Sequence, residues 1–393
     1  MVNPWLSIIG LSAHSAAELC AASRAALDEA EVIFGGPRHL EIVGAAERGR
    51  AWPLPFSVDP VLLCRGRKTV VLASGDPFWF GAGGSLSAHL DPGEWQTFAA
   101  TSTFSRVAAH LGWRLEEVTC HGLHAAPFAR LGPVLAPHGR LICLVRDGDA
   151  PAQLAKWLTG QGAGAATMWV MEAMGNEAER VRKVRANAFD LTDVAALVAV
   201  AVELPHGVGM SRASGLPDEV FANDGQITKR PVRALTLSAL APRAGEVLWD
   251  IGAGSGSVSV EWCLAGGHAI AFEQKTARAR NILRNAEDFG LTHRLTVCEG
   301  DANEALAQRA APDAVFVGGG GTDALFTKLF AVLPTGTRLV ANGVTLETEA
   351  LLAKLHAARG GTLLRIELAQ ATPLGRMRGW TSARPVVQWS VTL

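Results

Sequence analysis

The chain has 393 residues, 49% of them hydrophobic and 19% charged, with a formal net charge of −1. This length exceeds what one hydrophobic core usually serves, so we expect two or three domains. The near-zero charge argues against a general nucleic-acid or membrane-surface binder. The start, MVNPWLSIIG, lacks a basic leader, and no apolar run reaches the roughly 18 residues of a membrane span. We therefore expect an untargeted protein without a membrane partner.

Cysteine and histidine are scattered along the chain. The six cysteines, at positions 20, 64, 120, 143, 263 and 298, form no C-x-x-C or zinc spacing. We expect them to be buried free thiols in a reducing cytoplasm. His121 and His124 are the one close pair among eleven histidines, so no metal site is expected.

Short apolar runs alternate with helix-compatible segments through the first half. Strands are predicted at 6–9, 32–34, 69–73 and 96–100, and helices over 15–30 and 105–111. A second set follows, with strands at 118–120, 140–145, 166–171 and 195–202 and a helix over 150–158. This alternation is typical of α/β folds with parallel strands. We predict two lobes, about 1–115 and 116–204, with a ligand cleft between them.

The stretch PHGVGMSRASGLPD holds three glycines and two prolines without a sustained hydrophobic period. It predicts a linker over 205–217 that separates a domain 1–204 from a domain 218–393. In the second domain a helix is expected to end near residue 240, with strands at 247–251, 268–272, 295–298, 314–317 and 337–341. A hairpin of 362–368 with 385–391 would complete a seven-stranded sheet with one antiparallel member, and 369–383 would be a loop.

The second domain is organised around VLWDIGAGSGSVSVEW, residues 247–262, where a strand meets a glycine turn and a helix. Such a turn presents backbone N–H groups and a positive dipole end to a ligand. Ser257 stands where a dinucleotide fingerprint needs a third glycine. Glu273 ends the next strand, well placed for ribose hydroxyls, and Asp301-Ala302 follows the one after. The pattern favours S-adenosylmethionine over a nicotinamide or flavin, and a turn with a packing role alone is the other alternative.

Two sets of motifs resemble known families. In the second half, FANDGQITKRPVRALTLSAL, VLWDIGAGSGSVSVEW, EGDANEAL and VGGGGTDAL resemble the decarboxylating precorrin methyltransferases of the cobalamin pathway. In the first half, WLSIIGLSAHS, FGGPRHL, VLASGDPFWFGAG and TSTFSRVAAHLGW resemble the tetrapyrrole (corrin/porphyrin) methylases. Fused in this order, they resemble the precorrin-6B C5,15-methyltransferases (decarboxylating) over almost the whole chain.

The resemblance implies a two-lobed tetrapyrrole-methylase fold followed by a Rossmann-like, seven-stranded class I methyltransferase fold. It implies methylation of precorrin-6B at C5 by the first half and at C15 by the second. The second half would also decarboxylate the ring C acetate, giving precorrin-8X. The substrate form stays open between metal-free and cobalt-bound, and the fusion favours the metal-free one. The family further implies a homo-oligomer formed through the C-terminal domain, such as a tetramer.

The resemblance also implies one S-adenosylmethionine site in each half. In the second half the contacts that carry over are Thr228, Gly252, Ala253, Gly254, Ser255, Gly256, Glu273, Asp301 and Ala302. In the first half they are Gly75, Asp76, Pro77, Phe80, Thr101 and Ser102. Asp76 could instead bond its own backbone in a Ser-Gly-Asp-Pro turn. Residues 10–14, GLSAH, depart from the family's G-x-G-P-G turn, which leaves a role for His14 open.

A substrate with many carboxylates needs cationic partners, and arginine binds carboxylates through two parallel hydrogen bonds. The candidates in the second half are Arg230, Arg233, Arg376, Arg378 and Arg384. The alternative for each is a solvated surface charge. For the run RVRKVR, residues 180–185, we expect that alternative. No catalytic residue is assigned, because methyl transfer to an electron-rich carbon depends mainly on orientation of the two reactants.

Two other functions stay open. The second half could be a generic class I methyltransferase acting on RNA or protein. Such an enzyme would show an Asn/Asp-Pro-Pro-Tyr or cysteine motif after its fourth strand, where this chain has GGGG at 318–321 and contains no Tyr. The first half could bind cofactor or tetrapyrrole without turnover, which the altered loop at residues 12–13 favours.

Overall fold

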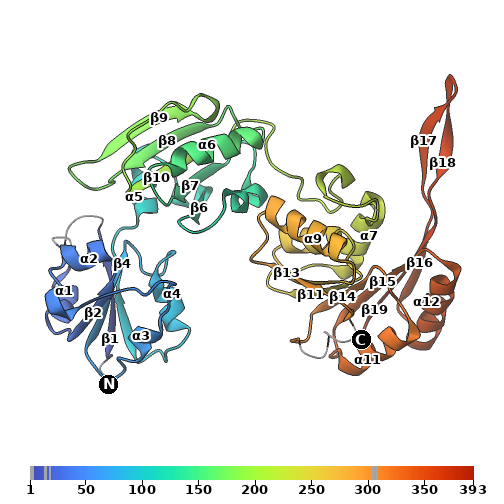
Figure 1. Cartoon of the computed structure of the whole chain (residues 1–393), viewed down its shortest axis with the longest axis horizontal. Helices are drawn as coiled ribbons and strands as arrows, with labels where there is room; N and C mark the ends of the chain where they lie inside the picture. Colours follow the sequence, from blue (N-terminus) through green and yellow to red (C-terminus); the bar gives the residue numbers. More distant parts are fainter. Residues whose placement is uncertain (1–3, 13–15, 17–18, 303–305, 307–308) are drawn as a thin grey trace. The chain divides into compact units, whose positions relative to one another are not determined.

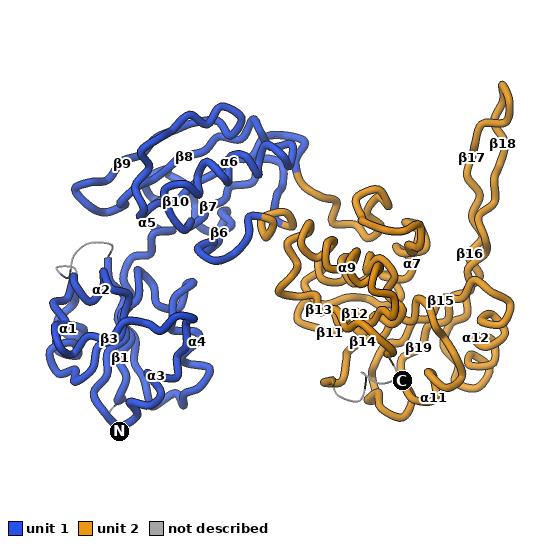
Figure 2. Tube along the Cα trace, viewed as in Figure 1, with its two compact units in different colours: residues 1–128, 134–208 blue, residues 129–133, 209–393 orange. Residues whose placement is uncertain are grey.

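The computed structural model describes residues 4–12, 16, 19–302, 306 and 309–393. His14, singled out above, lies outside the described residues. The chain forms two compact units, shown in two colours in Figure 2. The first comprises residues Met1–Phe128 and Val134–Val208, and the second comprises Ala129–Pro133 and Gly209–Leu393.

The first lobe of the first unit is a five-stranded sheet in which every pairing is parallel. Its strands, in the order β3-β2-β4-β1-β5, are Gly49–Ala51, Val32–Gly35, Thr69–Ser74, Leu6–Leu11 and Trp95–Phe98. Its helices are α1 (Ala21–Asp28), α2 (Pro37–Ile42), α3 (Asp59–Leu62) and α4 (Ala82–Ser87). The three central strands, β1, β2 and β4, are almost wholly buried and mostly apolar, as expected where helices cover both faces of a parallel sheet.

The second lobe holds a mixed five-stranded sheet, in contrast to the wholly parallel arrangement of the first. Its order, β6-β7-β10-β8-β9, corresponds to Val118–Gly122, Arg140–Leu144, Val198–Glu203, Thr167–Glu172 and Arg180–Arg185. The pairing β6–β7 is parallel, and the other three pairings are antiparallel. Helix α5 (Thr103–Leu111) precedes this sheet, and α6 (Ala150–Gly160) lies between β7 and β8. The predicted α/β class is thus confirmed (Figure 1).

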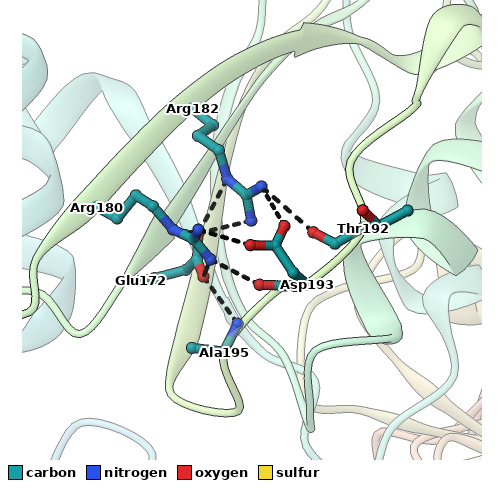
Figure 3. A network of polar contacts seen from close by, with 6 residues as sticks. All are labelled: Glu172, Arg180, Arg182, Thr192, Asp193 and Ala195. Carbon is teal, nitrogen blue, oxygen red and sulfur yellow. Dashed lines mark hydrogen bonds and ion pairs between the residues drawn. The ribbon is translucent and has the colours of Figure 1, made fainter.

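The run 180–185 forms the edge strand β9, held by a cluster of charges drawn in Figure 3. Glu172, at the end of β8, is 2% exposed and accepts hydrogen bonds from Arg180 and Arg182. It also accepts one from the Ala195 N–H at 2.7 Å. Both arginines pair with Asp193, at 2.9 Å each. The run lies at the edge of its sheet and largely faces water, as predicted. Arg180 and Arg182 are nevertheless not plainly solvated charges, because their ion pairs anchor β9 and residues 192–195 to β8.

The second unit contains one seven-stranded sheet in the order β13-β12-β11-β14-β15-β19-β16. These strands are Leu295–Glu299, His268–Glu273, Val247–Ile251, Ala314–Val317, Arg338–Gly343, Val386–Thr392 and Thr362–Ile366. Strand β19 runs antiparallel to both of its neighbours, and the other pairings are parallel. The predicted seven-stranded sheet with one antiparallel member is confirmed.

Two hydrophobic clusters cover the two faces of this sheet. Leu248 belongs to one, whereas Trp249 and Ile251 belong to the other. The helices are α7 (Arg230–Leu240), α8 (Ser257–Leu264), α9 (Thr276–Asp288), α11 (Asp323–Val332) and α12 (Leu346–Arg359). Helix α8 is buried from Ser257 to Cys263, which explains why its sequence is apolar almost all round.

The predicted loop 369–383 is instead a two-stranded antiparallel ribbon, β17 (Ala369–Leu374) and β18 (Met377–Ser382). It forms a separate sheet that extends beyond β16, as Figure 1 shows. The side chains of Leu374, Met377 and Trp380 are 69%, 76% and 78% exposed. No apolar alternation marks these strands in the sequence, because their side chains are largely exposed in the described structure.

No helix of the described part is long and apolar enough to cross a membrane. All six cysteines are free thiols, but Cys20 is exposed and Cys64, Cys120 and Cys298 are half-buried. The expectation of uniformly buried thiols was therefore wrong for these four. Within the described ranges, no group of three or more His, Cys, Asp or Glu side chains could hold a metal ion.

Candidate functional site

The glycine turn after β11 adopts a backbone that side chains would obstruct. Gly252, Gly254 and Gly256 have φ angles of +66°, +61° and +70°, the left-handed region that favours glycine. A Cβ at Gly252 would lie 2.6 Å from the Gly319 carbonyl oxygen, and one at Gly256 would lie 2.7 Å from Ile282. The turn therefore lies directly against the glycine run that follows β14. Two adjacent strand ends with no side chains leave the backbone open to a ligand.

Two adjoining cavities open beside this turn, at the carboxyl ends of the parallel strands. One encloses about 230 Å³ and the other about 470 Å³, and Gly252, Arg278 and Gly319 line both. Of the predicted residues, Glu273, Asp301 and Ala302 line the smaller cavity. Thr228, Ala253, Gly254 and Arg384 line the larger one. Ligands of open α/β sheets bind at such strand ends, so seven of the nine predicted cofactor residues are brought together where a ligand is expected. Ser255 and Gly256 line neither cavity.

Glu273 is buried at the end of β12. Its carboxylate accepts hydrogen bonds from the Gly254 N–H at 2.8 Å and the Lys275 N–H at 2.9 Å. These bonds fix the carboxylate beside the glycine turn, and each oxygen keeps acceptor capacity for a further donor. The side chain is thus oriented for hydroxyl donors of a ligand in the smaller cavity.

Asp250 lies two residues before the turn and is fully buried against α8. Burial raises its pKa to about 6, with the hydrogen bond from Ser259 opposing and the nearby charge of Glu273 adding to the rise. Ser259 Oγ donates to Asp250 Oδ2 at 2.6 Å, and Oδ1 is buried without a hydrogen-bond partner among the described residues. The site therefore keeps a carboxyl that is partly protonated near pH 6. Sequence reasoning did not single out this residue.

The expectation that Arg233 binds a substrate carboxylate is wrong. It is 0% exposed, and its guanidinium donates to Glu261 at 2.6 Å and to Asp218 at 3.0 Å. It also donates to the backbone oxygens of Leu216 and Thr228. This guanidinium is fully used inside the fold, so it is not available to a substrate carboxylate. Its effect on the cavity is indirect, since it fixes the backbone at Thr228.

The other candidate arginines differ in their placement. Arg384 lines the larger cavity, whereas Arg230 is exposed at the start of α7. Arg376 and Arg378 are exposed on the β17–β18 ribbon, away from the residues that line either cavity. Of these candidates, Arg384 is therefore the one that lines either of the two cavities described above.

The residues of the second unit fit S-adenosylmethionine. The Ser255 hydroxyl, within the turn, is buried and lacks a hydrogen-bond partner among the described residues. Asn285 fixes this turn from behind, donating to the Ser255 carbonyl at 2.8 Å. A turn with glycine at every second position, an oriented acidic group and two adjoining cavities suit an elongated ligand with a nucleoside at one end.

The first unit has a cavity of its own, about 240 Å³, between the strand ends of its two sheets. Its lining residues are Leu11, Arg38, Ser74, Gly75, Thr101, Thr103, Arg106, His124, Leu144, Val145, Arg146, Met171, Ala173, Met174 and residues 196–199. Within the first-lobe sheet, β1 and the end of β4 lie close together, because a Cβ at Gly10 would lie 1.9 Å from the Gly75 carbonyl oxygen. Glycine at position 10 is therefore required for this junction.

The predicted residues of the first unit divide into two groups. Gly75 and Thr101 line the cavity. Asp76 accepts from the Phe78 N–H at 2.8 Å, the self-bonded turn named as its alternative, and Ser102 caps α5 by accepting from the Ser105 N–H. Pro77 accepts a hydrogen bond from the Gly83 N–H through its carbonyl. The Phe80 ring lies 5.7 Å from that of Phe104, so these four residues shape the walls more than they line the cavity.

Sequence reasoning missed the basic lining of this cavity, which includes Arg38, Arg106 and Arg146. Beside it, His39 Nε2 lies 2.9 Å from Ser74 Oγ. Burial, and then the charge of Arg38, lowers the pKa of His39 to about 4, so the imidazole is neutral at physiological pH. The motif FGGPRHL contains Arg38 and His39, but the sequence does not show that α2 places them next to the end of β4.

Comparisons with known proteins agree with this architecture. A family described as Tetrapyrrole (Corrin/Porphyrin) Methylases matches residues 6–190, and one described as Precorrin methyltransferase domain matches residues 219–393. The fold and the two sites thus define a pair of fused methyltransferase domains.

Full-length relatives show which family of methyltransferases this chain belongs to. A precorrin-6Y C(5,15)-methyltransferase [decarboxylating] from Sinorhizobium sp is 45% identical, covering 100% of this chain and 97% of the relative. One from Mycobacterium tuberculosis is 38% identical, covering 98% and 99%. The crystal structure of the C-terminal domain of the Rhodobacter capsulatus enzyme is 59% identical over 47% of this chain and 100% of its own, with a TM-score of 0.46. The chain belongs to the family of decarboxylating precorrin-6Y C(5,15)-methyltransferases.

Proposed function

We propose that this protein methylates precorrin-6B twice, at C5 in the first unit and at C15 in the second. The second unit also removes the ring C acetate carboxyl as carbon dioxide, giving precorrin-8X in cobalamin biosynthesis. The observation that carries the proposal is the glycine turn of the second unit, which opens on two cavities, in a chain related over its full length to enzymes named for this reaction. The separate cavity of the first unit supplies the second reaction centre.

We further propose one S-adenosylmethionine site per unit. When bound, this cofactor supplies an activated methyl group on a sulfonium. In the second unit, Gly252–Gly256 and Thr228 would hold its methionine end, and Glu273, Asp301 and Ala302 its nucleoside end. In the first unit, Gly75 and Thr101 would contact it, supported by Asp76, Pro77, Phe80 and Ser102. The protein would act mainly by orienting the two reactants, which is worth up to about 7–11 kcal/mol in ideal cases.

Arg384 would bind a carboxylate of the tetrapyrrole in the larger cavity, because its guanidinium suits paired carboxylate oxygens. Arg230, Arg376 and Arg378 remain proposed contacts at the periphery, reached by the outer carboxylates of a large macrocycle. Arg233 is left out of this set, since it is buried and internally paired.

The domain limits that we propose are 1–204 and 218–393, joined by a linker over 205–217. The division into compact units, after Val208, falls inside that linker. We also propose a cytoplasmic location, where the six free thiols would stay reduced.

We propose that the protein self-associates through the second unit, as a tetramer or smaller oligomer. The exposed apolar side chains Leu374, Met377 and Trp380 on the β17–β18 ribbon support this, because such exposure is uncommon away from interfaces. Replacing residues 371–380 by a short Gly-containing turn should dissociate the oligomer, so that light scattering measures a smaller mass for the particle in solution. A monomeric full-length chain would contradict the proposal.

The proposed reaction is tested by incubating the purified chain with precorrin-6B and S-adenosylmethionine and measuring the product mass. The expected product carries two added methyl groups and lacks one carbon dioxide. A product with no added methyl group would refute the function, and one with a single methyl group would refute the activity of one unit.

The cobalt-bound form is the second candidate substrate. Relatives from Pyrobaculum named probable cobalt-precorrin-6B C(15)-methyltransferases (decarboxylating) match 37–38% of this chain at 35–36% identity. The full-length relatives are named for precorrin-6Y without cobalt. Parallel assays with precorrin-6B and cobalt-precorrin-6B would distinguish the two, and we expect turnover of the metal-free form.

A further inference from the structure

Three polar side chains form a closed triangle behind the larger cavity of the second unit. They are Thr236 from α7, Asn342 from β15 and Gln388 from β19. Asn342 Nδ2 and Gln388 Nε2 each lie 3.0 Å from Thr236 Oγ1, and Gln388 Nε2 lies 2.9 Å from Asn342 Oδ1. Thr236 is 0% exposed and Gln388 4% exposed, while Asn342 is half-buried and lines the cavity.

The hydrogen bonds fix which way both amides face. The Thr236 hydroxyl donates its one hydrogen to the Val232 carbonyl at 2.9 Å. Its oxygen can therefore only accept from the two amides, so both must turn their NH₂ groups toward it. The second N–H of Gln388 then donates to Asn342 Oδ1. This arrangement holds the Asn342 side chain in one orientation at the cavity wall.

The triangle uses one of the two N–H groups of Asn342 Nδ2, so a second donor remains. Asn342 shares the cavity with Gly254, Gly319 and Arg384. A neutral amide donor orients a carboxylate with a weaker hydrogen bond than an arginine provides. That difference matters for decarboxylation, because strong binding of the carboxylate would stabilise the ground state and slow its loss.

We propose that Asn342 binds the carboxylate of the acetate that the second unit removes, and that Thr236 and Gln388 are positioning residues that orient it. This rests on the proposed function and names the substrate contact within that site. In the decarboxylation step that Asn342 would assist, the bond between the acetate methylene and its carboxyl carbon breaks. Carbon dioxide leaves, the electron pair passes into the conjugated macrocycle, and the methylene carbon takes a proton from water.

The test uses the full chain with precorrin-6B and S-adenosylmethionine. Asn342→Asp keeps the shape but replaces the donor by an anion that repels the acetate. We expect kcat/KM for carbon dioxide release to fall about 10- to 100-fold, with cofactor affinity by calorimetry within threefold and methylation by the first unit unchanged. Asn342→Ala serves the same comparison if the Asp variant does not fold.

The positioning role is tested by a matched pair at Thr236. Thr236→Val removes the hydroxyl that orients both amides and should lower kcat for carbon dioxide release about tenfold. Thr236→Ser keeps the hydroxyl and should retain the wild-type rate, although it loses a buried methyl group that Thr236→Val keeps. Equal rates in the two variants, or wild-type carbon dioxide release in Asn342→Asp, would overturn the inference. Absence of decarboxylation by the wild-type chain would instead refute the proposed function.

Discussion

Gly252 shows how one residue without a side chain can determine a site. Its contact with the Gly319 backbone excludes a Cβ, and its positive φ also disfavours one. We expect Gly252→Ala to weaken S-adenosylmethionine binding by the second unit at least tenfold, as measured by calorimetry. Gly336→Ala is the matched control, because Gly336 also has a positive φ, +94°, but nothing lies within 4 Å of its added Cβ. Equal affinity in the two variants would contradict the steric argument.

A second prediction at the scale of single residues concerns Asp250 and the pH dependence of the free energy of unfolding. Its pKa of about 6 in the folded chain exceeds the ordinary value of 3.8, a gap that corresponds to about 3 kcal/mol. Because the folded state binds the proton more tightly, the contribution of Asp250 to stability is full below pH 3.8 and is lost as pH rises through 6. Asp250→Asn removes this titration. The free energy of unfolding of the wild type should therefore fall relative to the variant by about 2 kcal/mol between pH 4 and pH 7.

Urea unfolding of the cofactor-free proteins at several pH values measures this difference. Both proteins contain the other titrating groups, so the effects of those groups on stability cancel in the comparison. Parallel stability curves for wild type and Asp250→Asn would show that Asp250 titrates normally.

At the scale of elements, Glu172 attaches the edge strand β9 to the rest of its sheet (Figure 3). Burial opposes its ionisation, but hydrogen bonds from Arg180, Ala195 and Arg182 outweigh burial and hold its pKa below 4.5. We expect Glu172→Gln to lower the free energy of unfolding of the first unit by about 1.5–3 kcal/mol, the usual value of a hydrogen bond to a charged group.

The control for this prediction is Glu203→Gln. Glu203 pairs with Arg140 on the same sheet, but their side chains are 42% and 34% exposed. An exposed pair contributes at most about 1 kcal/mol. Thermal unfolding of the two variants compares loss of the buried Glu172 carboxylate with loss of a surface ion pair. Equal losses of stability in the two variants would contradict the anchoring role of Glu172.

At the scale of the molecule, each unit has its own sheets and hydrophobic clusters, so each should fold and act separately. We expect residues 1–208 to add one methyl group to precorrin-6B without loss of carbon dioxide. Residues 209–393 should carry out C15 methylation and decarboxylation when supplied with the product of the first half. Mass spectrometry of the products distinguishes these outcomes. No methyl transfer by 1–208, alone or mixed with 209–393, would indicate a binding role for that unit.

The linear sequence determined the regular elements and the main site of the second unit. Strand β11 was predicted with the bounds that the structure has, because its residues are apolar apart from Asp250 and a glycine turn follows them. Strands β17 and β18 were missed, and β9 was expected only as a strand or helix edge that faces water. Edge strands and ribbons bury little and therefore carry no hydrophobic period.

Tertiary structure alone decided which polar side chains reach a ligand. Arg233 and Arg384 are equally basic in sequence, yet one is enclosed by Glu261 and Asp218 and the other lines a cavity. The same holds for Asn342, whose orientation depends on Thr236 and Gln388, residues 106 and 46 positions away. Backbone turns and apolar runs are local properties of the chain, whereas the burial and pairing of a charge depend on residues that only folding brings together.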